Sequence, residues 1–423
     1  MTPIYLLVAI PVLLLLTIAE MVYDSFRHGK RFSFQDTLTN LSCGFGNQGL
    51  NLFTEGLKLF LFIDIFYGKL AIGHIPHTWW SVLLCLFIFD FAFYWEHRLS
   101  HTINILWGTH VVHHSSEEYN LSIALRRSWL ADVVVIIFFL PIPMMGFAPE
   151  TFLTVVVIHN FYQFILHTKA IGKLPAWFSF AMHTPSHHRV HHGKDPKYID
   201  KNFSGVFILY DRIFGTFKEE EEEPTYGITT QLTTNNPWKV NLHYYQDLFR
   251  TVGQVKGISN KLKFLFGPTG WFPEEMGGYN APTQVDKNTY KKYSANTPSG
   301  LNAYVLVQFL MTFAGILLLL FNKKYMQGNL LTEEFEMLFF IILALSSVIP
   351  IALFDRHKNV GIMEYARLTL TYGVLIGYIF MQGTSDYPMA SFTVITAFFA
   401  LFVYWFARVW KNREGGEELR IMN

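Results

Sequence analysis

The sequence predicts an all-α, polytopic membrane protein with eight or nine transmembrane helices. Charged residues make up only 15% of the 423-residue chain and hydrophobic residues make up 51%, whereas roughly a quarter of an ordinary soluble domain is charged. The apolar residues also gather into runs of about the 20 residues that a helix needs to cross the hydrocarbon layer. This composition excludes a disordered chain, a collagen-like chain and most soluble enzymes.

Nine apolar segments are candidate membrane spans. Five come first, over residues 3–22, 50–67, 79–94, 129–147 and 152–166, and four follow a long polar stretch, over residues 301–321, 335–354, 368–381 and 390–409. The segment 50–67 is the weakest because it carries Glu55, Lys58 and Asp64, and an amphipathic or re-entrant helix is the alternative there. The polar stretch of residues 168–299 is expected to lie outside the membrane.

Loop charges predict the orientation of the chain. Lys and Arg are enriched in the short cytoplasmic loops of membrane proteins, and with nine spans the loop cations fall on one side, except Lys323 and Lys324. We therefore expect a multi-pass protein of a bacterial inner membrane or the endoplasmic reticulum, with its active site on the cytoplasmic side. The expected division is N-terminal helices over 1–77, a histidine-rich core over 78–217, a cytosolic extension over 218–299 and C-terminal helices over 300–423.

Net charge and cysteine content exclude two further classes of function. Lys and Arg total 33 while Asp and Glu total 32, so the chain has no overall basic field that would attract nucleic acid. The two cysteines, Cys43 and Cys85, are too few for a disulfide framework or a thiolate metal site. Histidine is the enriched metal ligand, because 12 of the 17 histidines lie between His97 and His192.

Three histidine motifs carry the functional argument. An HxxxH motif begins at His97, an HxxHH motif begins at His110, and a second HxxHH motif begins at His188. Residues three or four apart share a face of a helix, so the imidazoles of one motif can point to one site. The eight motif histidines are His97, His101, His110, His113, His114, His188, His191 and His192.

Eight neutral imidazoles exceed the four ligands of one closed zinc site. They fit two metal ions, and imidazole binds iron as well as zinc. Two neighbouring irons can activate O2 for attack on an unactivated C–H bond, which at a membrane boundary points to an acyl or alkyl chain. A bis-histidine haem would need axial histidines within the spans, and surface histidines near head groups would leave the repeated spacing to chance, so neither alternative is favoured.

These motifs resemble the histidine boxes of the fatty acid hydroxylase/sterol desaturase superfamily over about residues 83–217. Within that superfamily the sequence is most similar to the alkylglycerol monooxygenase family. The segments that carry the similarity are WEHR at 95–98, HHSSEEYNLS at 113–122, YQF at 162–164, TPSHHRVHHG at 184–193 and DRIFGTF at 211–217. One departure is His183, where the family pattern has Asn.

The resemblance implies a non-haem di-iron monooxygenase. Such an enzyme uses O2 and tetrahydrobiopterin to hydroxylate the carbon beside the ether oxygen of an alkylglycerol, and the hemiacetal collapses to a fatty aldehyde. Zinc is expected to replace iron in some purified material, because imidazole binds both. The resemblance also implies that His167 is a ligand, and His187 is a tenth candidate because it lies four residues before His191. No catalytic group beyond the metal ligands and no pterin site is assigned.

Five residues are candidates to orient the ligating imidazoles. A metal-bound histidine usually donates its other ring N–H to a carboxylate, a carbonyl or water. The candidates are Asp90, Glu96, Asn120, Gln163 and Asp211. The alternative for the carboxylates is that each is an ordinary charge at a helix end and does not interact with a metal ligand. No role is assigned to His159 or His183.

Two other functions compete with ether cleavage. The first is sterol desaturation or fatty-chain hydroxylation by the same superfamily, with a protein as electron donor. No fused cytochrome domain is visible in the sequence, which favours a diffusible reductant. The second is a metal transporter or sensor, which would need ligands along a path through the bilayer, whereas these histidines gather on one predicted side.

Overall fold

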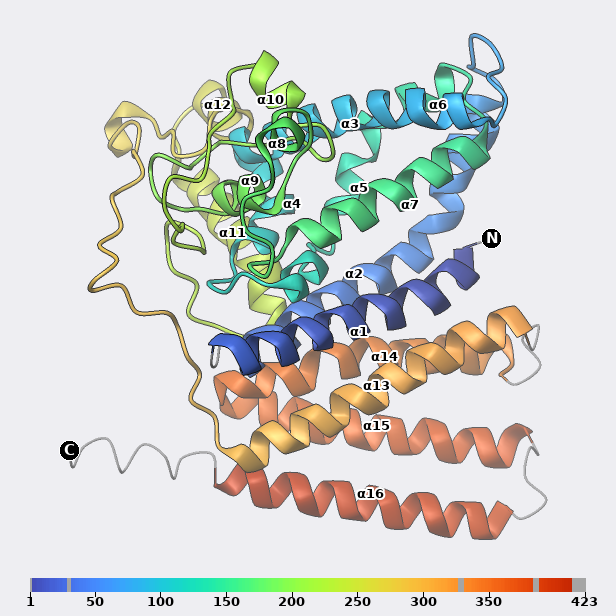
Figure 1. The fold of residues 1–423 in the computed structure, drawn as a ribbon. Helices are drawn as coiled ribbons and strands as arrows, with labels where there is room; N and C mark the ends of the chain where they lie inside the picture. Colours follow the sequence, from blue (N-terminus) through green and yellow to red (C-terminus); the bar gives the residue numbers. More distant parts are fainter. Residues whose placement is uncertain (1, 29–31, 326–330, 383–387, 413–423) are drawn as a thin grey trace. The chain divides into compact units, whose positions relative to one another are not determined.

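The computed structural model describes residues 2–28, 32–325, 331–382 and 388–412, and over them the elements are all helical, as predicted (Figure 1). The long helices are α1 (Thr2–His28), α2 (Phe34–Leu59), α3 (Trp79–Thr102), α4 (Asn104–His114), α7 (Pro149–Leu166), α11 (Pro237–Gln254), α13 (Ser299–Tyr325), α14 (Glu333–Ala352), α15 (Lys358–Gln382) and α16 (Pro388–Lys411). The short elements are the π-helix η1 (Phe60–Tyr67), α5 (Ala131–Val134), α6 (Pro141–Met144), α8 (Ala176–Ala181), α9 (Pro185–His191), α10 (Leu209–Ile213), α12 (Ile258–Phe266) and the 3₁₀ turns η2 (Leu121–Leu125), η3 (Val135–Phe138), η4 (Glu274–Met276) and η5 (Leu353–Asp355).

The chain divides into two compact units, which we describe separately. The first unit consists of residues 1–18, 234–239 and 294–423. Its helices α13, α14, α15 and α16 pack in sequence order, and α13 also packs against α16 (Figure 1). A buried ion pair between Glu364 and Arg367 of α15 lies inside this bundle.

The second unit consists of residues 19–233 and 240–293 and contains all three histidine motifs. Helix α3 begins after Thr78, whose side chain accepts a hydrogen bond from Ser81 N, and it ends at Thr102 because Ile103 is extended. The next helix, α4, then packs against α3, α7 packs against α3, and α9 packs against α7. The motifs lie on α3, on α4 and on α9 with its last histidine just after the helix, and α7, which is followed by His167, packs against both α3 and α9.

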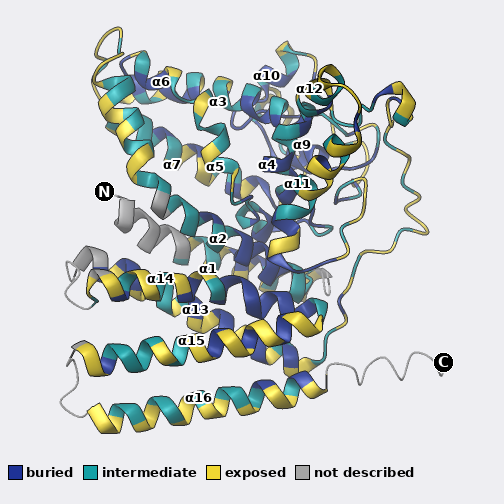
Figure 2. Cartoon of the chain, turned by 180° about the vertical axis from the view of Figure 1, so that it is seen from behind, coloured by how far each residue is buried: buried dark blue, intermediate teal, exposed yellow. Residues whose placement is uncertain are grey.

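Four helical segments are long and apolar enough to cross a membrane: Trp79–Thr102, Ser299–Asn322, Glu334–Asp355 and Pro388–Lys411. They coincide with four of the nine spans expected from the sequence and make this an integral membrane protein. Helix α16 is largely exposed along its length, as expected of a helix that faces lipid (Figure 2). The total of eight or nine spans and the cytoplasmic orientation remain predictions.

One expected span, residues 129–147, is not a continuous helix. The chain forms the short α5, a 3₁₀ turn and the short α6 there instead. Pro141 and Pro143 lack the backbone N–H that an α-helix interior needs, and the run Val133–Ile137 is β-branched throughout, which lowers helix propensity. Apolar composition alone therefore overstated the regularity of this segment.

Candidate metal centre

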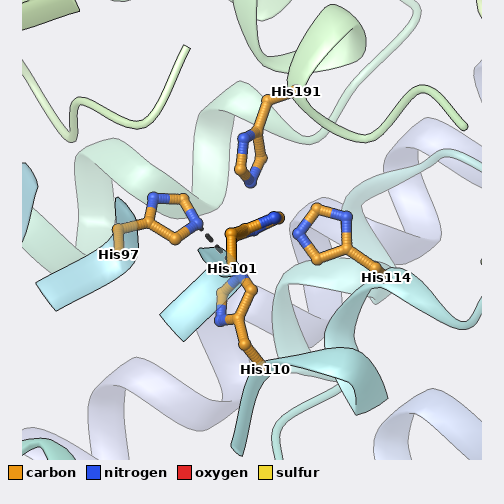
Figure 3. A group of neighbouring side chains, drawn as sticks. All are labelled: His97, His101, His110, His114 and His191. Atoms are coloured by element: carbon orange, nitrogen blue, oxygen red, sulfur yellow. Dashed lines mark hydrogen bonds between the residues drawn. The ribbon is translucent and has the colours of Figure 1, made fainter. Parts of the chain in front are cut away.

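Nine histidines from four parts of the second unit converge into two groups. The first group consists of His97, His101, His110, His114 and His191, and the second consists of His113, His167, His188 and His192. Within each group one ring nitrogen per residue lies within 4.8 Å of the others. In Figure 3 the five imidazoles of the first group point toward a common centre.

The helical spacing explains why each HxxHH motif contributes to both groups. Adjacent residues of an α-helix project about 100° apart around its axis, so the two neighbouring histidines of an HxxHH motif point in different directions, and the last one shares a face with the first. In α4 the outer pair, His110 and His114, belongs to the first group, while His113 belongs to the second. In the second motif the division is reversed, because the outer pair belongs to the second group and His191 belongs to the first. Each of the two motifs therefore contributes imidazoles to both groups.

Backbone carbonyls fix the tautomer of several of these rings. The Nδ1 atom of His97 lies 2.7 Å from the carbonyl oxygen of Phe203, and that of His191 lies 3.0 Å from the carbonyl oxygen of Lys201. In the second group, His167 Nδ1 lies 2.8 Å from Gln163 O. A carbonyl can only accept, so Nδ1 carries the proton and Nε2 presents its lone pair to the centre.

The Nε2 atoms of the clustered histidines either lie close to one another or have no hydrogen-bond partner. The Nε2 atoms of His97 and His110 lie 2.9 Å apart, and those of His167 and His188 also lie 2.9 Å apart. The Nε2 atoms of His101, His114, His191 and His192 are buried without a hydrogen-bond partner. Buried polar atoms are normally satisfied, so these converging lone pairs fit a pair of bound divalent cations.

Burial keeps the clustered imidazoles in the neutral form that binds a metal. Loss of hydration lowers the pKa of His167 to about 4. The same cause, reinforced by neighbouring imidazoles, lowers the pKa of a further set well below the usual value: His110, His113, His114, His188, His191 and His192. A deprotonated donor set is a condition for metal binding at neutral pH.

Three of the expected orienting residues act through their side chains on one loop, residues 203–207, rather than on an imidazole of the two groups. Asp211 accepts hydrogen bonds from the backbone N–H groups of Phe203 and Ser204, both at 2.8 Å. Asp90 accepts from Val206 N at 2.7 Å and from Phe207 N at 2.8 Å. Gln163 donates its side-chain amide to the carbonyl of Gly205. The loop held in this way presents the Phe203 carbonyl to His97.

The other expected helpers do not reach the centre. Glu96 accepts a hydrogen bond from Ser100 of the same helix, and the side-chain oxygen of Asn120 accepts from Ser122 at the start of η2. His187 lies outside both groups, and its Nδ1 atom instead faces the backbone N–H of Thr184, which caps α9. The buried His159 pairs with Asp90, and both nitrogens of His183 are buried without a hydrogen-bond partner.

The sequence analysis missed several hydrogen-bond partners of the clustered imidazoles. The carbonyls of Phe203, Lys201 and Arg126 leave no side-chain signal, because every residue has a carbonyl. The carboxylate of Asp200 lies 3.7 Å from Nδ1 of His101. Asp200 and Asn202 both adopt a positive φ, a conformation in which Asp and Asn are enriched, so these two residue types in close succession were the available sequence signal for the turn.

Comparison with known proteins identifies the family. The fatty acid hydroxylase family model matches residues 82–216. The chain is 32% identical over 422 residues to the alkylglycerol monooxygenase of Danio rerio, covering 97% of this chain and 90% of that protein. It is 34% identical over 375 residues to that of Homo sapiens, covering 86% and 81%. The chain belongs to the alkylglycerol monooxygenase family.

Other lipid hydroxylases are similar over a smaller share of the chain. The cholesterol 25-hydroxylase of Homo sapiens is 27% identical over 147 residues, which is 32% of this chain and 51% of that protein. All nine clustered histidines lie within the matched residues 82–216. No solved structure matches the chain.

Proposed function

We propose that the two histidine groups hold a pair of iron ions in an O2-dependent monooxygenase that acts on alkylglycerols. In this reaction the ether R–CH2–O–R′, O2, two electrons and two protons give water and a hemiacetal, which collapses to a fatty aldehyde and a free glycerol hydroxyl. Tetrahydrobiopterin is the proposed electron donor. The observation that carries the proposal is the convergence of nine imidazoles into two groups in a chain of this family.

The donor set supports iron or zinc rather than a hard cation. Imidazole suits both of these metals, whereas Mg²⁺ and Ca²⁺ take oxygen ligands. When bound, an iron pair supplies the reduction of O2 that attack on an unactivated C–H bond requires. The chain's own residues hold the rings in one tautomer through Phe203, Lys201 and Gln163, and seven of the nine histidines are buried from bulk water.

The placement of the first motif supports a centre at a membrane boundary. His97 and His101 lie in the last two turns of α3, a candidate span that begins at Trp79. A substrate with a polar glycerol head and an alkyl chain would therefore meet the metals where the polar and apolar layers join. We propose that this boundary is the cytoplasmic face of a bacterial inner membrane or of the endoplasmic reticulum.

The proposal is tested by turnover of a 1-O-alkylglycerol in iron-loaded membranes, with and without tetrahydrobiopterin, scored by aldehyde release. His113→Ala should abolish the release, and His243→Ala is the matched control because His243 lies on α11 with its Nδ1 atom facing Val240 O. Pterin-dependent aldehyde supports the proposal. Turnover of a sterol or fatty chain with a reduced protein donor, and none of the ether, would transfer the assignment to the superfamily's other reactions.

A further inference from the structure

The short helix α10 packs along the middle of α3. The hydroxyl of Tyr210 donates a hydrogen bond to the carbonyl of Phe87 at 2.7 Å. The ring of Tyr210 also lies 5.6 Å from that of Phe91, and the ring of Phe214, which ends α10, lies 5.1 Å from that of Trp95. These contacts follow α3 over two turns.

The position of these contacts places α10 at membrane depth. An α-helix rises 1.5 Å per residue, so Phe87 and Phe91 lie roughly 12 and 18 Å along α3 from its first residue, Trp79. The hydrocarbon layer is about 30 Å thick. If α3 spans the membrane, α10 therefore lies within the layer and not in the water beyond it.

The outer surface of α10 and of the neighbouring α8 is apolar and exposed. Ile213 at the end of α10 is 70% exposed, and Trp177 and Phe180 of α8 are 77% and 60% exposed. We call these three residues the α8–α10 patch. An exposed apolar side of α3 adjoins the α8–α10 patch. Phe87 and Phe91 of α3 are each more than 40% exposed, and both contact Tyr210 of α10.

Arg212 joins the two short helices in a way that suits an apolar medium. Its guanidinium donates to the carbonyl of Phe180 at 3.0 Å and to that of Ser179 at 3.4 Å, and it lies 3.7 Å from the centre of the Phe217 ring. The last carbonyls of a helix have no partner within the helix, and leaving them unpaired in hydrocarbon is costly. The Arg212 guanidinium thus provides hydrogen-bond donors for the last carbonyl groups of α8.

We propose that the α8–α10 patch is embedded in the acyl-chain layer, beside the metal centre. In the sequence, α9 with His188 and His191 lies between α8 and α10. The ring of His187 on α9 lies 5.4 Å from that of Phe217, which Arg212 also contacts. Acyl or alkyl chains that cover the patch are therefore next to the element that carries the second HxxHH motif, and this surface is where a lipid substrate approaches from the membrane.

Spin labels test the embedding without any turnover. The full chain in phosphatidylcholine vesicles carries a nitroxide on Phe180→Cys, Ile213→Cys or, as control, Tyr279→Cys. Tyr279 matches Phe180 in exposure, at 61%, and lies in the segment that follows α12, which contacts the last residue of α3 through the hydrogen bond from Thr269 N to Thr102 O. Cys43 and Cys85 are fully buried, so the label reacts at the introduced cysteine.

Labels at 180 and 213 should collide severalfold more with dissolved O2 than with a water-soluble nickel chelate, relative to the label at 279. Equal access of the chelate to all three sites would overturn the proposal. Exclusion of both reagents, with spin–spin broadening, would show that a second copy of the chain covers the patch and would overturn it as well.

The approach of substrate through the patch rests on the proposed function and has its own test. Trp177→Asp should raise KM severalfold for a long-chain alkylglycerol in vesicles, while kcat and the KM for a short, water-soluble alkylglycerol stay unchanged. Tyr279→Asp is the control and should change neither. A loss of kcat on both substrates would overturn the substrate route, and the spin-label result would still decide the embedding.

Discussion

The Nε2 atoms of His113 and His167 lie 3.0 Å apart, although the Nδ1 atom of each ring faces a backbone carbonyl. Each Nδ1 therefore donates its proton outward, and burial keeps both rings neutral by lowering their pKa values. Two lone pairs then point at each other in a buried site. A shared cation would remove the repulsion, so this pair of residues supports the proposal that the second group binds a metal.

Loss of a ligand should affect the two groups differently. His113→Ala leaves three imidazoles in the second group, whereas His114→Ala leaves four in the first, enough for a closed tetrahedral site. We expect His113→Ala to lower the bound metal from about two ions to one per chain, and His114→Ala to retain more. Metal analysis by mass spectrometry after desalting measures this, and an equal loss in His243→Ala would contradict it.

Gly205 is predicted to be intolerant of a side chain. A Cβ there would collide with His159 Nε2 and Asp90 Oδ1, so the loop that presents the Phe203 carbonyl to His97 must shift. Overpacking of this kind usually costs about 1–3 kcal/mol. Gly205→Ala should therefore lower the thermal unfolding midpoint in detergent and weaken metal retention.

Gly172→Ala is the matched control for that substitution, because a Cβ at Gly172 would meet nothing within 4 Å. It should leave both readouts unchanged. An unchanged midpoint and full metal content in Gly205→Ala would show that the loop does not control the orientation of His97.

The sequence predicted which histidines gather better than it predicted the groups that orient them. Spacing within each motif placed His110 and His114 on one face, and nothing beyond helical geometry was needed to expect that they meet. The expected carboxylates Asp90 and Asp211 were near the centre, yet they bind backbone N–H groups of one loop, and the imidazole that Asp90 also contacts, His159, lies outside the two groups. Which backbone groups a carboxylate reaches depends on the path of the loop, and spacing along the chain does not encode that path.

The structure differs from two other expectations, for His187 and for residues 129–147, because of local structure that the sequence pattern did not include. His187 shares a helical stripe with His191, but it lies at the start of α9, where its ring nitrogen faces the Thr184 backbone N–H. Apolar composition over 129–147 suggested a span, whereas the chain forms α5, a 3₁₀ turn and a separate short helix that begins at Pro141. In the first case a hydrogen bond at the start of a helix, and in the second the start of a separate helix at a proline, determined the local structure against the expectation from the sequence.

The metal-free protein should lose stability as the pH falls. His167 has a pKa of about 4 in the folded chain because it is buried, against about 6.5 in an unfolded chain. Between these values the unfolded state binds a proton that the folded state does not, so stability is present above about pH 6.5 and is lost toward pH 4, by about 3 kcal/mol at most for this residue. Unfolding midpoints of chelator-treated protein from pH 8 to pH 5 measure this.

His167→Gln should flatten part of that pH profile, because it removes one of the protons taken up on unfolding. Saturation with zinc should move the loss of stability to lower pH, since the metal competes with protons for the same nitrogens. A stability that rises as the pH falls would contradict the burial of neutral imidazoles.

The ion pair between Glu364 and Arg367 should show strong coupling in the C-terminal bundle. Glu364 is 0% exposed and Arg367 is 5% exposed. Arg367 donates to Glu364 Oε2 at 2.7 Å and to Ser346 Oγ at 2.9 Å.

Arg367→Leu leaves a buried carboxylate without its cation, which typically costs about 3–5 kcal/mol. The double substitution with Glu364→Leu should cost less than Arg367→Leu alone, because it removes the uncompensated charge. Unfolding free energies of the three variants in lipid bicelles give the coupling, and strictly additive losses would show that the two charges do not compensate each other.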